Sequence, residues 1–240
     1  MLLLTGLTTV LFVSSARNEI SIIENQEIKN ISTISKLIIR GFDSAISEVI
    51  FLSELASNYN YKNTGEFLDA VSSFLKSKRY FQKITLVDKD GNILIEIKEE
   101  ANEFIITPSN QNIKNNIDFR NSLAAGRGHV YVSDFQIDEG VPVLIFGIPV
   151  IDRNKKKKAI LLVNYNCKPI FDIFRTTFEQ KEDDRSVRYA RYFIVDEDGY
   201  WIKGPKPEDE FGFLYDSKSD RRFGNIFSDA WGKISKDQTG

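Results

Sequence analysis

Two pairs of carboxylates, each two residues apart, are the first residues of this chain whose spacing suggests chemistry. Asp88 and Asp90 lie in the run Leu-Val-Asp-Lys-Asp-Gly, and Asp196 and Asp198 lie in the later run Ile-Val-Asp-Glu-Asp-Gly. Paired carboxylates serve glycosidases and calcium loops, but a calcium loop needs further oxygen ligands and a distant bidentate Glu, which neither run supplies. Because each run follows an apolar segment and ends in Asp-Gly, both are predicted to be β-hairpin turns of two related modules.

Other candidates for catalysis are few. Cys167 and His129 are the only cysteine and the only histidine, so an internal disulfide is excluded and a zinc site is poorly supported. Ser122 and Ser133 have no nucleophile motif around them, and the sequence has no glycine-rich phosphate loop. We therefore predict no catalytic residue, no metal site and no cofactor.

The composition limits the classes of protein that this chain can represent. With 240 residues, of which 42% are hydrophobic, it can bury one large core or two smaller ones. Its net charge of −2 gives no general attraction to nucleic acid. The basic run at residues 153–158 lies between two apolar strands, so it is interpreted as a solvated hairpin loop rather than a nuclear signal.

The first 16 residues carry no charge. They are fewer than the ~20 residues that a helix needs to cross a bilayer. Three interpretations remain open: the C-terminal part of a membrane anchor, a signal peptide, or the end of a buried helix. The first two both export the rest of the chain.

Residues 17–58 are predicted to form one long helix, because they contain no proline and only one glycine, Gly41. Apolar residues recur along it at nearly heptad spacing. These residues are Ile20, Ile23, Ile28, Ile31, Ile34, Ile38, Phe42, Ala45, Val49 and Leu52. Such a helix can serve as a stalk that pairs with its copy in a homodimer, or it can pack only against its own domain.

The elements after this helix indicate an antiparallel α+β fold. Helices are predicted at residues 64–77, 118–125 and 169–178, and strands at 80–87, 92–98, 129–137, 141–151 and 159–166. A charged connector follows at residues 179–184.

Several segments of the chain resemble a known family. They are Gly-His-Val-Tyr-Val-Ser at residues 128–133, Phe-Gly-Ile-Pro-Val-Ile-Asp at 146–152, Leu-Leu-Val-Asn-Tyr-Asn at 161–166 and Asp-Gly-Tyr-Trp-Ile-Lys-Gly-Pro at 198–205. Together with residues 223–231, they are similar to the double Cache, PAS-like extracellular sensor domains of bacterial histidine kinases and related transducers. The resemblance covers nearly all of the chain after residue 16.

The resemblance implies a sensor outside the bacterial inner membrane, in which tandem PAS-like modules follow a stalk helix. It divides the chain into an anchor or signal segment (1–16), the stalk (17–58), a membrane-distal module (59–178), a connector (179–187) and a membrane-proximal module (188–240). After Gly199 too little chain remains to close a second sheet, so the second module is expected to be incomplete. A kinase, cyclase or methyl-accepting output domain would then lie beyond Gly240.

The family's amino-acid-binding motif consists of Tyr, Arg, Trp-Tyr and Ala, with a later Asp. On this chain the corresponding positions are Gln111, Asn116, Asp118-Phe119, Ser122 and Asn164. Only Phe119 keeps the family's chemistry. A neutral Asn116 cannot grip a carboxylate as Arg does, and Asn164 lacks the charge that holds an ammonium group. The resemblance therefore disfavours a standard amino acid as the ligand.

A pocket of different chemistry in the distal module stays open as a prediction, because aromatic, amide and carboxylate side chains suit a small polar ligand. The candidate ligand-binding residues are Asn116, Asp118, Phe119, Arg120, Tyr131, Asp134, Phe146 and Asn164. In the alternative interpretation the aromatic residues are core, Asp134 caps a loop and Arg120 is a solvated helix residue. An open cavity around Phe119, Tyr131 and Asn164 would favour the first interpretation.

The leading hypothesis is the ligand-sensing ectodomain of a membrane-bound histidine kinase. A chemoreceptor or diguanylate cyclase ectodomain has the same features. The alternative, from a different functional class, is an exported dimerisation module that binds no small-molecule ligand. A hydrolase would need a cleft with convergent acid and base residues, which the sequence does not indicate.

Overall fold

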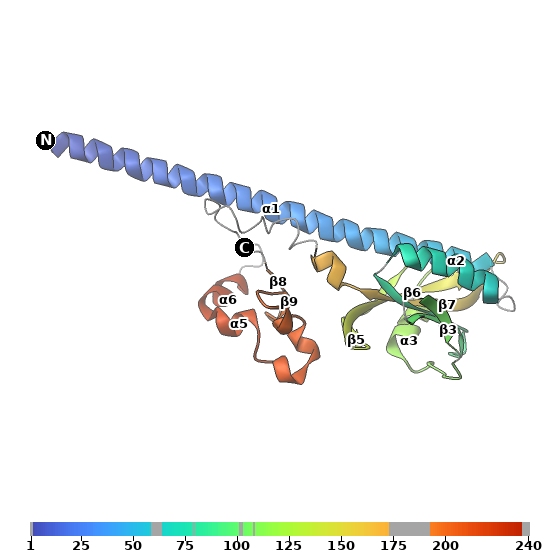
Figure 1. Cartoon of the computed structure of the whole chain (residues 1–240). Helices are drawn as coiled ribbons and strands as arrows, with labels where there is room; N and C mark the ends of the chain where they lie inside the picture. Colours follow the sequence, from blue (N-terminus) through green and yellow to red (C-terminus); the bar gives the residue numbers. More distant parts are fainter. Residues whose placement is uncertain are drawn as a thin grey trace.

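The computed structural model describes residues 2–58, 64–78, 80–100, 103–107, 109–172 and 193–236. The predicted connector at residues 179–187 and most of the predicted helix at 169–178 lie outside these ranges. A single helix forms the long axis, and a sheet lies alongside its C-terminal end (Figure 1). The predicted α+β class, with a long N-terminal helix and an antiparallel sheet, is confirmed.

Helix α1 (Leu2–Asn58) contains the predicted stalk and begins before it. Its 57 residues make it about 85 Å long, at ~1.5 Å of rise per residue. Within the described residues, no helix has a stretch that is long and apolar enough to cross a membrane. Gly41 permits a close contact, since a Cβ atom there would lie 2.1 Å from Cδ1 of Ile170.

The apolar stripe of α1 has two parts. Towards its C-terminal end, Ala45, Val49 and Leu52 are buried in the core that α1 forms with the sheet, and Ile38 and Phe42 are half-buried against that core. Ile34 is also buried. Nearer the N-terminus, where α1 extends past the sheet (Figure 1), large apolar side chains are exposed. These exposed residues are Ile22, Ile23, Ile28 and Ile31. The predicted stripe thus packs against its own domain only along its C-terminal half.

The strands of the sheet are β1 (Phe81–Val87), β2 (Ile93–Glu100), β3 (Glu103–Thr107), β4 (Tyr131–Val132), β5 (Gln136–Asp138), β6 (Val141–Ile151) and β7 (Lys157–Asn166). Their order is β3-β2-β1-β7-β6-β4, with β5 paired to β6, and all paired strands are antiparallel. Helix α2 (Thr64–Ser77) lies next to α1, with the rings of Phe74 and Phe51 5.7 Å apart (Figure 1). Residues 153–156 of the basic run lie in the β6–β7 turn, as predicted, and its last two lysines, Lys157 and Lys158, begin β7.

The predicted strand 129–137 is wrong, because the structure divides it into β4 and β5. Ser133 interrupts the pairing: its Oγ accepts a hydrogen bond from the Ile145 amide at 2.8 Å and donates one to the Asp134 carbonyl at 2.6 Å. A side chain that bonds backbone groups in this way competes with a regular ladder. After the interruption, β5 pairs with β6, the same strand that β4 pairs with, in a register shifted by one residue.

The two faces of the sheet pack against different helices. Alternate residues such as Phe146, Val163 and Tyr165 form the main core with α1 and α2. On the opposite face, Ile160 and Leu162 form a smaller cluster with Phe119 of helix α3 (Ile117–Ala124). We call this second face the outer face.

Both Asp-Gly runs are hairpin turns, as predicted, and their hydrogen bonds match. The Asp88 carboxylate accepts from the backbone amides of Asp90 and Asn92, each at 2.8 Å. The Asp196 carboxylate accepts from the amides two and four residues later, at 3.0 Å and 2.8 Å. The first Asp of each pair therefore stabilises its own turn.

The C-terminal group of elements surrounds Trp201, which is fully buried. It contains β8 (Ile194–Val195), β9 (Trp201–Lys203), α5 (Phe223–Ile226), α6 (Ser228–Ile234) and three 3-10 turns. We call these elements, residues 193–236, the C-terminal group. It lies on the side of the sheet nearer the N-terminus of α1 (Figure 1).

Candidate functional site

Helix α3 begins at a capping residue, Asn116, and packs closely on the outer face over a glycine, Gly147. The Asn116 side chain caps the helix by accepting a hydrogen bond from the Phe119 amide at 3.0 Å. Ser122 fits directly over Gly147 of β6, where a Cβ atom would lie 1.7 Å from the Ser122 Oγ. This close approach buries both Phe119 and Asp118.

Asp118 is a buried carboxylate held by two neutral side chains, and only 2% of its surface is exposed. It accepts hydrogen bonds from the Tyr131 hydroxyl at 3.0 Å and from Nε2 of Gln136 at 2.9 Å. Burial raises the pKa of Tyr131, and the neighbouring Asp118 carboxylate adds to this rise. The Tyr131 hydroxyl is therefore kept protonated and donates to Asp118.

A second polar group lies in the middle of the outer face. Nδ2 of Asn164 on β7 donates to Oδ2 of Asp138 at 2.5 Å. Lys83 on β1 contacts the same Asp138 carboxylate, at 2.9 Å from Nζ to Oδ2. Lys83 and Asn164 are register partners, which places their side chains on one face of the sheet.

Strand β5 connects these two polar groups. Gln136 and Asp138 are two residues apart, so both side chains project from the same side of the strand. One bonds Asp118 of α3, and the other bonds the central strands β7 and β1. Strand β5 therefore attaches α3 to the middle of the sheet.

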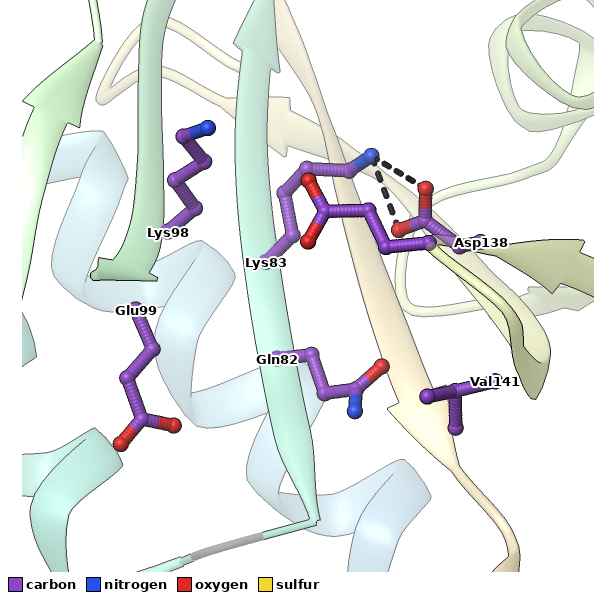
Figure 2. A pocket seen from close by; sticks show the side chains of 7 residues that line it. Gln82, Lys83, Lys98, Glu99, Asp138 and Val141 are labelled. Atoms are coloured by element: carbon purple, nitrogen blue, oxygen red, sulfur yellow. Dashed lines mark hydrogen bonds and ion pairs between the residues drawn. The ribbon is translucent and has the colours of Figure 1, made fainter. Parts of the chain in front are cut away.

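A pocket of about 370 Å³ lies beside the ion pair of Lys83 and Asp138 (Figure 2). One wall is the sheet, where Lys83 and Lys98 are register partners on adjacent strands. The β5–β6 hairpin forms the other wall, and Asp138 reaches across to Lys83 (Figure 2). The lining residues are Gln82, Lys83, Lys98, Glu99, Asp138, Glu139 and Val141. Such a polar lining suits a small polar molecule.

The structure brings three of the predicted site residues into the two polar groups: Asp118, Tyr131 and Asn164. Phe119 lies next to them in the apolar cluster, so the space below α3 is filled rather than open. The pocket beside Lys83 and Asp138 lies at the β5–β6 hairpin instead.

The other predicted residues lie elsewhere. Asn116 is the exposed cap of α3, and Arg120 and Asp134 are also exposed. The placement of Phe146 beside Asn164 is wrong, because Phe146 lies on the opposite face of the sheet, with its ring 5.3 Å from that of Tyr165. Strand alternation explains the error, since Phe146 pairs with Val163 and not with Asn164.

Sequence reasoning missed Lys83, Gln136 and Asp138. A signal for Lys83 was present, since it is a charged residue within an otherwise mainly apolar strand. Gln136 lies near the end of the segment 129–137 that was predicted as one continuous strand, and Asp138 lies directly after that segment. The role of both residues depends on the break at Ser133.

Cys167 is a packed core residue. It is fully buried, and burial raises the pKa of its thiol to about 12. The thiol is therefore protonated at neutral pH and is a poor nucleophile. Within the described residues, no group of three or more His, Cys, Asp or Glu side chains is placed to hold a metal ion.

Comparison with known proteins identifies the class. The family model for the sensor domain of bacterial histidine kinases matches residues 44–240. The chain therefore belongs to the family of bacterial histidine kinase sensor domains. This membership confirms the sensor-domain resemblance. A search of the curated proteins finds no significant match.

Solved structures share the fold at low sequence identity. The extracellular domain of a histidine kinase, vpHK1S-Z8, matches with a TM-score of 0.64 and 15% identity, over 85% of this chain and 78% of that one. A domain of a sensory box/GGDEF family protein from Vibrio parahaemolyticus has a TM-score of 0.63 and 15% identity, over 88% and 84%. The ligand-binding domain of the Campylobacter jejuni chemoreceptor Tlp3, in complex with L-valine, has a TM-score of 0.53 and 14% identity, over 78% and 71%.

Proposed function

We propose that this chain is the extracytoplasmic sensor region of a membrane-bound histidine kinase, and that a small polar molecule binds in the pocket beside Lys83 and Asp138. The observation that carries the proposal is the meeting of a pocket with an ion pair whose partners come from two different walls. A ligand that bonds Lys83 or Asn164 competes with Asp138, so binding favours one position of β5 over another. The chain itself is proposed to be a receptor and not an enzyme.

The ligand is proposed to differ from a standard amino acid. The Tlp3 domain of similar fold was solved with L-valine. In this chain, Asn116 is used as a helix cap, and Asn164 already donates to Asp138. Both positions therefore lack the charge that a zwitterionic ligand needs, and both have structural partners.

Transmission is proposed to run through α1 in a homodimer, with residues 1–16 as part of a membrane anchor. The support is the row of exposed apolar residues on the N-terminal half of α1, where Ile28 and Ile31 are 64% and 56% exposed. Exposed isoleucines at helical spacing are stabilised by burial against a second copy.

The ligand proposal is tested by thermal unfolding of the chain from residue 17 onward in the presence of separate sets of organic acids, amines, sugars and nucleobases. A ligand at a hundred times its Kd adds about 2.7 kcal/mol to the free energy of unfolding. A stabilising compound should lose its effect in Lys83→Gln and Asn164→Ala, and keep it in the control Lys89→Gln, which changes an exposed lysine in the β1–β2 turn. Stabilisation that persists in both pocket variants would contradict this site.

The dimer proposal is tested by sedimentation. The double variant Ile28→Glu, Ile31→Glu should be monomeric at concentrations at which the unmodified chain is a dimer. The matched control is Glu24→Gln, Glu27→Gln on the same half of α1. A monomeric unmodified chain would contradict the proposal.

A further inference from the structure

Strand β5 contacts the pocket on one side and is joined to the C-terminal group through the residue that precedes it. Asp138 of β5 holds Lys83 and Asn164 at the pocket. Phe135, directly before β5, packs its ring 5.4 Å from the ring of Phe211 and 6.0 Å from that of Phe213. A segment of four residues thus connects the pocket wall to the C-terminal group.

In the C-terminal group, the residue that Phe135 contacts, Phe211, is fixed by its surroundings. It is 4% exposed, and its φ of +54° lies in the left-handed region that residues other than glycine rarely adopt. Its amide donates to the carbonyl of Trp201 at 2.7 Å. Such a conformation persists only when the surrounding contacts fix it. A shift of Phe135 therefore acts on a residue that is bonded directly to the core of the C-terminal group.

A second link joins the same two parts by a different route. Lys203 of β9 makes ion pairs with Asp172 at 3.0 Å and with Glu210 at 2.9 Å. Asp172 follows β7, next to Ile170 and Phe171, which pack in the main core. This ion pair anchors the C-terminal group to the core of the sheet module, whereas the Phe135 contact starts at the pocket wall.

We propose that β5 reports the state of the pocket to the C-terminal group through the contact between Phe135 and Phe211. When Asp138 loses Lys83 and Asn164 as partners, β5 shifts away from β1 and β7 while it stays paired to β6, and Phe135 repacks against Phe211. The hydrogen bond from Phe211 to Trp201 then weakens. That a ligand triggers this coupling rests on the proposed function. A substitution at Asp138 breaks the same contacts without any ligand, so the coupling can be tested separately.

The chain itself provides the probe. Its two tryptophans are Trp201 and Trp231, and both lie in the C-terminal group, so tryptophan fluorescence reports on that group alone. Asp138→Asn should shift the tryptophan emission and speed hydrogen exchange at the Phe211 amide at least about fivefold, the lower end of typical allosteric coupling. Glu99→Gln, which changes the lining of the same pocket away from β5, should change neither reading.

A double-mutant cycle tests the route. In a Phe135→Leu background, Asp138→Asn should have no further effect on emission or on exchange at Phe211. Lys83→Gln is the second perturbation, because it removes the ion pair without altering β5 and keeps the test decisive if Asp138→Asn unfolds. The proposal is overturned if folded variants at both positions leave these readings unchanged, or if the effect persists without Phe135. A positive cycle combined with a ligand screen that finds nothing would contradict the proposed function and support the coupling.

Discussion

Asn164 and Tyr165 are consecutive residues of β7 that contact opposite sides of the sheet. On the outer face, Asn164 donates to Asp138 at the pocket wall. On the other face, the ring of Tyr165 lies 6.0 Å from that of Phe42 on α1. Strand alternation thus leaves only one peptide unit between the candidate site and the stalk helix.

The first prediction concerns the contact between Asn164 and Asp138. Asn164→Asp replaces a hydrogen-bond donor with a second carboxylate next to Asp138, so two like charges meet where one hydrogen bond was made. We expect this change to lower the free energy of unfolding by about 1–3 kcal/mol. Urea denaturation at neutral pH measures it. Asn164→Ala is the control: it removes the donor without adding charge and should cost less.

Equal losses for the two Asn164 variants would show that the added charge is solvated. In that case Asp138 would not be held at the sheet in solution.

The second prediction concerns alkaline pH. Burial raises the pKa of Tyr165 well above its usual value of 10.0. Above pH 10 the unfolded chain therefore loses this proton while the folded chain keeps it, and stability falls as the pH rises. The fall attributable to one such group is up to about 1.4 kcal/mol per pH unit. Tyr165→Phe should remove this part of the fall in unfolding free energy, as measured by urea unfolding between pH 9 and pH 11.

The control for Tyr165 is the range below pH 9. There the unfolding free energies of the unmodified chain and of Tyr165→Phe should change with pH in parallel, because the tyrosine is protonated in both the folded and the unfolded chain. Parallel curves above pH 10 would mean that Tyr165 reaches solvent in the folded protein.

The third prediction concerns Gly41, which lets α1 pack closely against Ile170. Ala in place of Gly in a helix normally stabilises it by about 1 kcal/mol. At Gly41 the added Cβ would lie 2.1 Å from Cδ1 of Ile170, which is buried, so we expect Gly41→Ala to destabilise by about 1–3 kcal/mol instead. Combining it with Ile170→Ala should cost less than the sum of the two single changes. Thermal unfolding of the four proteins measures this coupling.

The fourth prediction concerns the close contact between α3 and Gly147 of β6. Gly147→Ala would place a Cβ atom 1.7 Å from Oγ of Ser122 and should destabilise the protein by about 1–3 kcal/mol. It should also weaken the proposed ligand binding at the pocket, because α3 positions Asp118, which holds β5 through Gln136. The matched control is Gly65→Ala on α2, where the added Cβ meets no atom of the described residues within 4 Å, apart from its own helix backbone. An equal or larger loss at Gly65 would exclude steric clash as the cause.

Local patterns in the sequence were enough to predict much of the fold. The helix at residues 64–77 was found from its apolar face and the strand at 141–151 from its apolar run, and both agree with the structure. The two Asp-Gly turns were identified because Gly91 and Gly199 supply the positive φ that such turns need. Strand β3 was missed, since its five residues follow a charged segment without a turn signal of their own.

The sequence by itself determined the long helix, the hairpins and the sensor-domain resemblance, because these depend on neighbours along the chain and on recognisable segments. Only the tertiary structure decided which polar residues meet. Lys83, Asp138 and Asn164 come from three separate strands, and the break at Ser133 shifts the register of β5 along β6 by one residue. Contacts between residues far apart in the chain depend on register and on the packing of whole elements. The face to which Phe146 points was settled in the same way, by strand register rather than by residue type.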